Sequence, residues 1–207
     1  MSSDEKQQDS AAQPRRRLSR EERQKQLLEA AWRLVREEGS DALTLGRLAE
    51  LAGVTKPVVY DHFGTRQGLL AVLYQDFDAR QTAAMDAALD TAEPTLEGIA
   101  RVIASSYVAC VLQQGREIPG VTAALAGSPE LERIKREYEA IFLAKCRAVL
   151  SPFTGQGGLG AAGLRAMLGA AEALSHAAAA EEITPAQAEE ELFATLVALV
   201  QRSQRAG

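Results

Sequence analysis

Residues 44–70 constrain the fold of this chain more than any other stretch, because short helical patterns alternate there with sharp breaks. The segment reads TLGRLAELAGVTKPVVYDHFGTRQGLL. Thr44 and Thr55 are typical of helix N-caps, and Gly53 supplies the positive φ that a tight turn between two helices needs. Pro57 is tolerated because the amides of a first helical turn have no partner inside the helix. The spacing predicts a helix-turn-helix arrangement followed by a further helix.

The composition favours an all-α protein. Alanine loses no side-chain entropy in a helix, and this chain has alanine-rich runs whereas only 5% of its residues are aromatic. With 207 residues, the chain is long enough for a small and a medium domain. We predict about nine helices, in an N-terminal three-helix domain at residues 18–64 and a longer helical domain at residues 65–207.

The net charge of −5 is distributed unevenly along the chain. Residues 1–13 carry one Lys against three acidic residues, residues 14–66 carry eleven Lys and Arg against eight, and residues 67–207 carry eleven against seventeen. Phosphate binding needs positive charge where the contact occurs, and not over the whole molecule. The segment with the helix-turn-helix pattern is therefore the part suited to DNA.

The first 17 residues have no apolar side chain of useful size after Met1, which predicts disorder. Their basic triplet Arg15, Arg16, Arg17 has two readings. It is either a solvated charge run or a flexible arm that follows the phosphates or enters the minor groove.

Several classes of protein and site are disfavoured. Cys110 and Cys146 stand alone in apolar helical patterns without a metal-binding spacing, so we expect small buried side chains. The first 13 residues are polar, and no uninterrupted apolar run approaches the roughly 18 residues of a membrane span. No nucleophile with an adjacent base and no carboxylate pair emerges. We expect a cytoplasmic protein with no catalytic residue, no metal site and no cofactor.

The helix before the opening stretch has clear ends. Ser19 and Glu22 have the spacing of a capping box, and Gly39 is placed to end the helix as a left-handed cap. Trp32 is expected to pack within the small domain. One apolar stripe is formed by Leu27, Ala31, Leu34 and Val35.

The helix that opens at Thr55 should turn one face inward and one outward. Val59 and Phe63 are spaced i and i+4 and should be its inner face. Lys56 can donate to guanine or to phosphate, while Pro57 and Val58 can contact thymine methyl groups. The side chains suited to phosphate oxygens are those of Thr44, Tyr60, His62 and Arg66.

At these residues the chain resembles a known family. The run GVTKPVVYDHFGTRQGLL and the two helical patterns before it, over residues 19–70, are similar to the DNA-binding domain of the TetR family of bacterial transcriptional regulators. The resemblance implies base contacts from Lys56, Pro57 and Val58. The full expected DNA-contacting set is Arg17, Thr44, Thr55, Lys56, Pro57, Val58, Tyr60, His62 and Arg66.

Two positions depart from the family pattern. Arg66 stands where Lys is more common, which keeps the charge but changes the donor geometry. Asp61 places an anion on the outward face, where phosphate would repel it unless it points aside or accepts from cytosine N4.

The resemblance also implies a small-molecule pocket in the longer domain, for a ligand expected to be apolar. From the residues alone, ordinary core packing is the favoured alternative for each candidate. The candidates are Phe77, Met85, Tyr107, Cys110, Phe142, Cys146, Met167 and His176.

The pattern at residues 159–180 is rich in Ala and Gly, which allow close approach of another helix, and the pattern from Thr184 onward has an apolar stripe wide enough for two neighbours. They form either an internal hairpin or, as the resemblance implies, a four-helix bundle between two copies of the chain. The expected interface residues are Leu164, Leu168, Leu192, Phe193, Leu196, Val197 and Val200.

Together these patterns predict a regulator that binds double-stranded DNA. The expected form is a homodimeric repressor on a palindromic operator, released when a ligand shifts the long helix that begins at Arg66. The alternatives are a DNA-binding regulator without an effector and a helical small-molecule carrier or enzyme.

Overall fold

The computed structural model describes residues 18–205, and within them the chain forms nine α-helices, two short 3-10 turns and no strand. This confirms the predicted all-α fold. Residues 1–17, with the predicted basic arm and its Arg15, Arg16 and Arg17, lie outside the described residues. The helices are α1 (Arg20–Glu38), α2 (Leu45–Ala52), α3 (Lys56–Phe63), α4 (Arg66–Asp90), α5 (Leu96–Glu117), α6 (Pro119–Leu125), α7 (Pro129–Leu150), α8 (Ala161–Ala179) and α9 (Pro185–Arg205), and the turns are η1 (Ser40–Ala42) and η2 (Ser151–Phe153).

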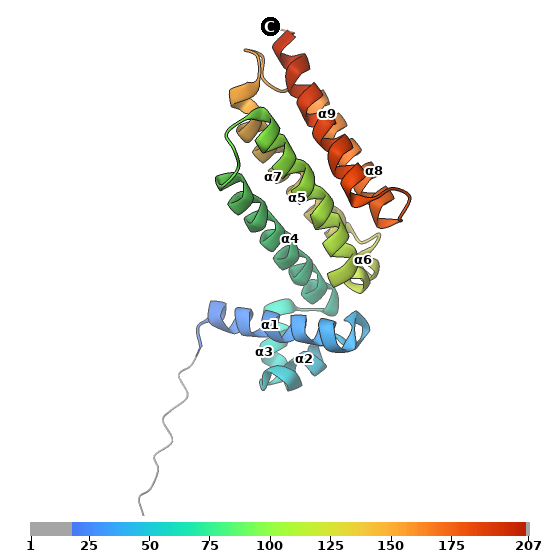
Figure 1. Ribbon diagram of the computed structural model, residues 1–207. Coiled ribbons are helices and arrows are strands. Elements are labelled where there is room, and N and C mark those ends of the chain that lie inside the picture. Colours follow the sequence, from blue (N-terminus) through green and yellow to red (C-terminus); the bar gives the residue numbers. More distant parts are fainter. Residues whose placement is uncertain (1–17, 206–207) are drawn as a thin grey trace, which may run out of the picture.

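Helices α1 to α3 form a head at one end of the molecule, and α4 to α9 form an elongated body (Figure 1). In this view α1 lies crosswise beneath the body, while α4 rises from the head along it. The C-terminal end of α9 lies at the end of the body farthest from the head. The 25-residue α4 is thus the helix that joins the two parts.

The first helix forms as its sequence predicts. Ser19 Oγ accepts from the Glu22 amide at 3.1 Å, and Glu22 Oε2 accepts from the Ser19 amide at 2.7 Å, which completes the capping box. The predicted apolar stripe is buried, and Trp32 packs beside it with 7% of its surface exposed. The sequence therefore determines both the start of α1 and its buried face.

Two glycines set the turns of the head. Gly53 follows α2 with φ 65° and ψ 35°, the predicted left-handed conformation. Gly39 also has a positive φ, 83°, but its ψ of 168° is extended, so it is not the left-handed cap that was predicted. The extended ψ leads the chain directly into η1 rather than into a loop.

The buried apolar side chains form two clusters, and the first of them crosses from the head into the body. It joins the head to Leu69, Leu70 and Phe77 of α4 and to residues of α6 and α7 such as Val121 and Ile134. The predicted domain boundary between residues 64 and 65 therefore cuts through one continuous core. The second cluster lies within the body, between α4, α5, α7, α8 and α9.

The central helix of the body is α5, which packs against α4, α7, α8 and α9. By length and composition it is also the one helix within residues 18–205 that is apolar enough to cross a membrane. Its buried residues are Ala100, Ile103, Ala104 and Val108. Arg101 on its surface pairs with Glu190 of α9 at 3.1 Å.

The last two helices correct the predicted dimer interface. Five of its seven residues are at most 4% exposed, because α8 and α9 pack on each other and on α5 within one chain. Phe193 is half-buried beneath the Arg101 guanidinium, 4.1 Å from its ring centroid, and Val197 is also half-buried. The predicted apolar stripe thus belongs mainly to the core of the subunit. The five core residues are Leu164, Leu168, Leu192, Leu196 and Val200.

Candidate nucleic-acid interface and ligand cavity

Helix α3 turns one polar face to solvent, as its spacing predicts. Val59 and Phe63 are 0% and 6% exposed and anchor the helix in the head, whereas Tyr60 is 54% exposed. Val58 and His62 are half-buried at the edges of the outward face. The remaining exposed residues of this segment are Thr55, Lys56, Pro57 and Asp61.

Lys56 lies against the start of α2. Its Cε and Nζ are 3.5 and 3.8 Å from the place where a Cβ would stand on Gly46, and Thr44 Oγ1 is 3.9 Å from the same point. Thr44 Oγ1 also caps α2 by accepting from the Arg47 amide at 3.1 Å, which leaves its hydroxyl hydrogen able to donate. An ammonium, a hydroxyl and a helix N-terminus therefore converge, a combination that suits a phosphate oxygen.

The anion on the outward face has a partner. Arg20 Nη1 donates to Asp61 Oδ2 at 2.8 Å, and Arg20 Nη2 donates to the Asp61 carbonyl at 3.2 Å. Of the two alternatives for Asp61, the structure shows the one in which it points aside and is neutralised. Nothing in the local sequence of α3 signals this contact, because Arg20 stands 41 residues earlier.

The ring of His62 is half-buried. Burial, with the nearby positive charge of Arg20 as the second cause, lowers its pKa below 6.5. Its Nδ1 is buried and has no hydrogen-bond partner in residues 18–205, so a proton on Nε2 leaves only a lone pair buried. Nε2 is then the nitrogen that can donate to a phosphate.

Arg66 has a structural role that its sequence position does not reveal. Its Nε donates to the Leu43 carbonyl at 2.9 Å and its Nη2 to the Ser40 carbonyl at 2.8 Å, which ties α4 to η1 and to the chain before α2. Three of the five guanidinium N–H groups remain for the predicted phosphate contact. Only the fork of an arginine can hold both carbonyls in this way, which gives the departure from lysine a physical reason.

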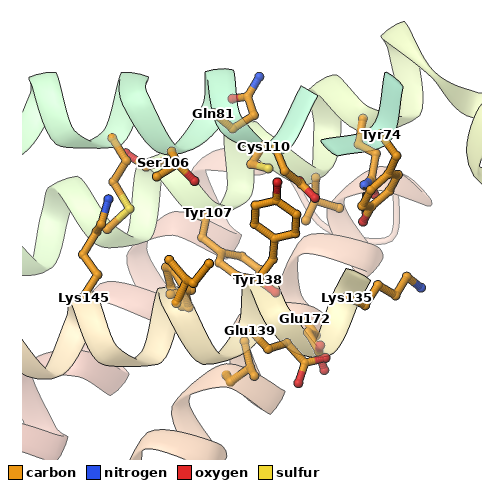
Figure 2. Close-up of a pocket in the computed structure, with 18 of the residues that line it drawn as sticks. Tyr74, Gln81, Ser106, Tyr107, Cys110, Lys135, Tyr138, Glu139, Lys145 and Glu172 are labelled. Atoms are coloured by element: carbon orange, nitrogen blue, oxygen red, sulfur yellow. Dashed lines mark hydrogen bonds between the residues drawn. The ribbon is translucent and has the colours of Figure 1, made fainter. Parts of the chain in front are cut away.

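A cavity of about 220 Å³ lies in the body between α4, α5, α7 and α8. Figure 2 shows Tyr107, Tyr138 and Cys110 together in its middle, with Lys145 toward one end and Lys135 and Tyr74 toward the other. Five of the eight predicted ligand-binding residues line it. They are Met85, Tyr107, Cys110, Phe142 and His176.

The other three predicted residues do not reach the cavity. Phe77 belongs to the first core cluster, and Cys146 and Met167 belong to the second, each at most 1% exposed. Helical spacing places all three on apolar stripes but does not distinguish a stripe that faces a cavity from one that faces a core. For these residues core packing was the correct alternative.

Sequence reasoning missed most of the polar lining, and with it the character of the cavity. Thirteen of the nineteen lining residues carry a polar or charged group. The cavity thus combines polar groups with apolar surface, and the expectation of an apolar ligand stays a prediction. The polar residues that were not predicted are Tyr74, Asp78, Gln81, Thr82, Ser106, Gln114, Lys135, Tyr138, Glu139, Lys145 and Glu172.

Burial raises the pKa of groups in the cavity and in the adjoining core. It raises the pKa of the Asp78 carboxyl to about 7, and it raises the pKa of the Cys110 and Cys146 thiols to about 12. Both thiols are therefore protonated at neutral pH and unsuited to nucleophilic chemistry. Within residues 18–205 no three His, Cys, Asp or Glu side chains gather in a way that could hold a metal ion.

A charged network joins α1 of the head to α4 and α5 of the body. Trp32 Nε1 donates to Asp76 Oδ2 at 2.7 Å, and the Arg80 guanidinium lies 4.4 Å from the centroid of the Trp32 ring. Arg80 also pairs with Asp76 at 3.3 Å and with Glu117 at 3.5 Å. The network includes α4 and α5, two of the four helices that border the cavity, so it connects those helices to the head.

A second contact between head and body is steric. Helix α6 packs on η1, and a Cβ on Gly120 would stand 1.8 Å from Ser40 Oγ and 2.9 Å from Ser40 Cβ. Only glycine allows this approach. Through Ser40, the same turn is held by Arg66, so α6, η1 and the start of α4 form one junction.

Comparison with known proteins agrees with this geometry. Residues 27–73 match the model of the family described as bacterial regulatory proteins, tetR family. The chain is also similar to the HTH-type transcriptional activator FasR of Mycolicibacterium smegmatis, with 34% identity over 110 residues. That match covers 44% of this chain and 50% of FasR, so the chain spans about half the length of this relative.

Solved structures share the whole fold. A putative transcriptional regulator from Pseudomonas aeruginosa PAO1 superposes with a TM-score of 0.68 at 18% identity, over 92% of this chain and 96% of that one. A TetR-family transcriptional regulator from Streptomyces coelicolor superposes with a TM-score of 0.59 at 20% identity, over 87% and 95%. These relatives are transcriptional regulators and not enzymes. The comparisons therefore show a TetR-type DNA-binding domain over residues 27–73, and the solved structures show that the rest of the chain shares the fold of these regulators.

Proposed function

We propose that this protein is a cytoplasmic, sequence-specific DNA-binding regulator of transcription. The observation that carries the proposal is the outward face of α3 beside the N-terminus of α2, where Lys56, Thr44 and the helix amides converge. Tyr60 and the Nε2 of His62 extend this face toward the duplex backbone. Lys56, Pro57 and Val58 at the start of α3 meet the base edges, and Thr55 and Arg66 add backbone contacts.

Binding of the purified protein to its own upstream DNA tests this proposal. Lys56→Ala should weaken binding about tenfold and relax sequence preference, because it removes a positive charge at the groove. Arg147→Ala is the matched control, since Arg147 is an exposed cation of α7 in the body. Fluorescence anisotropy on a labelled duplex provides the affinities. If Lys56→Ala and wild type bind the duplex with equal affinity, the proposed DNA interface is wrong.

The protein acts as a homodimer on a palindromic operator in this proposal. One α3 helix reads only a few base pairs, and two copies double the site. With the predicted stripe buried, the surfaces left for a partner are the exposed faces of α8 and α9. On α8 these residues are Ala162, Ala166, Gly169 and Ala173, which are small enough for close approach of a second helix.

Ligand binding in the cavity controls the affinity for DNA. Tyr74 and Asp78 of α4 line the cavity, while Leu69 and Leu70 at the start of the same helix lie in the core shared with the head. A ligand that favours one position of α4 over another would shift the two heads of the dimer between competent and incompetent spacings. Operator affinity that stays constant at saturating occupancy of the cavity would contradict this control.

Repression is the proposed output, and activation is the second candidate because FasR is named an activator. Transcription in vitro from the protein's own upstream DNA distinguishes them. Adding protein lowers transcript yield from a repressed promoter and raises it from an activated one.

A further inference from the structure

Asp78 is the unusual group in the cavity. It stands one helical turn after Tyr74 on α4, on the same lining face as Gln81, Thr82 and Met85. Its side chain is largely withdrawn from solvent, yet in the described part of the chain its carboxylate takes part in no hydrogen bond and no ion pair. A buried carboxylate in proteins is ordinarily paired, since the loss of hydration is otherwise uncompensated.

In the described structure, the lysines that line the cavity form no ion pair with Asp78. Lys145 is paired with Asp86, and Lys135 is exposed at the surface of α7. The neighbouring carboxylate of Glu139 has its own partner, Arg165, at 3.0 Å. Burial alone accounts for the raised pKa of Asp78, with no opposing contribution from any cationic side chain in residues 18–205.

Two hydroxyl groups near Asp78 form hydrogen bonds with other residues. The Tyr74 hydroxyl accepts from Gln114 Nε2 at 3.0 Å, and the Tyr138 hydroxyl donates to the Gln75 carbonyl at 3.2 Å. Asp78 interacts electrostatically with both tyrosines and with Cys110, so it faces residues of α4, α5 and α7. The cavity therefore presents an acceptor that the protein leaves without a donor.

Aromatic rings line the same cavity as Asp78. Tyr74, Tyr107, Tyr138 and Phe142 all line the cavity, and the Tyr107 and Phe142 rings are 5.0 Å apart between centroids. The face of an aromatic ring attracts a cation, most strongly where water is excluded. Figure 2 shows Tyr107 and Tyr138 from two different helices turned toward the same space.

We propose that the cavity binds an organic monocation, a protonated or quaternary amine on an apolar body, with its positive charge at Asp78. The rings of Tyr74, Tyr107 and Tyr138 contact the charged end, and Met85, Phe142 and Leu168 contact the apolar body. Glu172, which also lines the cavity, adds negative potential at its α8 side. This inference rests on the proposed ligand control and names the chemical class of the ligand.

Three small probes with one ring and different charge test the site: phenethylammonium, phenethyl alcohol and phenylacetate. Calorimetric titration of the full-length protein should show that the cation binds about tenfold more tightly than the alcohol, and that the anion binds most weakly. Tighter binding of the alcohol or of phenylacetate overturns the proposal. So does the absence of measurable binding of the cation.

Two variants assign the selectivity to Asp78. Asp78→Asn keeps the size of the side chain and should lose about tenfold in affinity for phenethylammonium while its affinity for the alcohol is unchanged. Glu172→Gln is the matched control for a second cavity carboxylate and should lose less than about threefold. If Asp78→Asn binds the cation as wild type does, Asp78 is not the site.

DNA binding is measured separately, so the two proposals fail separately. Cation binding that depends on Asp78 but leaves operator affinity unchanged supports the site and contradicts ligand control. Release from the operator by phenethyl alcohol, without binding of the cation, supports ligand control and contradicts the cation site.

Discussion

At the scale of single residues, the outward face of α3 depends on a side chain outside it. Asp61 would add a negative charge where DNA phosphates approach, and Arg20 cancels that charge from the first turn of α1. Both side chains are 67% exposed, so the pair contributes little to stability. The ion pair should instead affect the affinity of the protein for DNA.

Arg20→Ala should therefore weaken DNA binding about three- to tenfold, because it leaves Asp61 uncompensated as well as removing a cation. The double variant with Asp61→Asn separates the two effects. Anisotropy titrations should show that Asp61→Asn restores part of the lost affinity. If Asp61→Asn restores none of the affinity, Arg20 contacts a phosphate directly, and the explanation that it neutralises Asp61 is wrong.

Asp78 links the cavity to the stability of the fold. Its pKa of about 7 in the folded protein lies above the ordinary value of 3.8, so the folded state holds a proton that the unfolded state has released. The free energy of unfolding should fall as pH rises from about 4 to about 7, since the unfolded state binds fewer protons in this range.

Asp78→Asn should not show this loss of stability. Its free energy of unfolding should exceed that of wild type by about 1–2 kcal/mol near pH 8 and should differ little from it near pH 4. Urea denaturation at the two pH values measures it. Asp90→Asn, at the exposed end of α4, is the control. A difference between Asp78→Asn and wild type that is the same at both pH values would contradict the prediction.

At the scale of helices, the junction of α6, η1 and α4 depends on the absence of one Cβ. Gly120→Ala places a methyl group within 1.8 Å of Ser40 Oγ, and the two elements must separate. We expect a loss of about 1–3 kcal/mol of stability, as for other overpacked contacts, together with an altered ligand response.

Thermal unfolding measures this effect against Gly115→Ala in the nearby α5. A Cβ on Gly115 meets nothing within 4 Å in the described structure, so that variant should gain about 0.5–1 kcal/mol from helix propensity. Ser40→Gly in the Gly120→Ala background should recover most of the loss. Equal stability of the two single variants would show that α6 does not press on η1.

At the scale of the whole molecule, the proposed dimer must form through surface that one copy leaves exposed. Ala166→Arg places a long charged side chain in the middle of the exposed small-residue face of α8, and we expect this variant to be a monomer where wild type is a dimer. Ala84→Arg, on the exposed surface of α4, is the control. Sedimentation velocity reports the mass. If Ala166→Arg is still a dimer, this face of α8 is not the dimer interface.

The sequence predicts local features of this protein well. The capping box of Ser19 and Glu22, the turn at Gly53 and the buried pair of Val59 and Phe63 depend on residues within one or two turns. Helical period is enough to place them. The same reasoning predicted the three helices of the head, because they are short and consecutive in sequence.

Features that depend on distant residues could not be predicted in the same way. Leu192 and Leu196 face their own chain, and a stripe does not reveal whether its neighbour is α5 or a second subunit. The roles of Arg66 and Asp61 depend on Ser40 and Arg20, which are far away in sequence. Asp78 is an ordinary surface residue by spacing and becomes distinctive only when α5 and α7 enclose it.

The core that runs from the head into α4, α6 and α7 also bears on how the protein unfolds. Leu69 and Leu70 are fully buried against head residues, so the head and the base of the body should lose their structure in one cooperative step. Slow amide exchange should then extend without interruption from α1 into the first turns of α4. A fragment that ends at residue 64 would expose the apolar side of α1 and α3, and the smallest unit that can fold and bind DNA should include the base of the body.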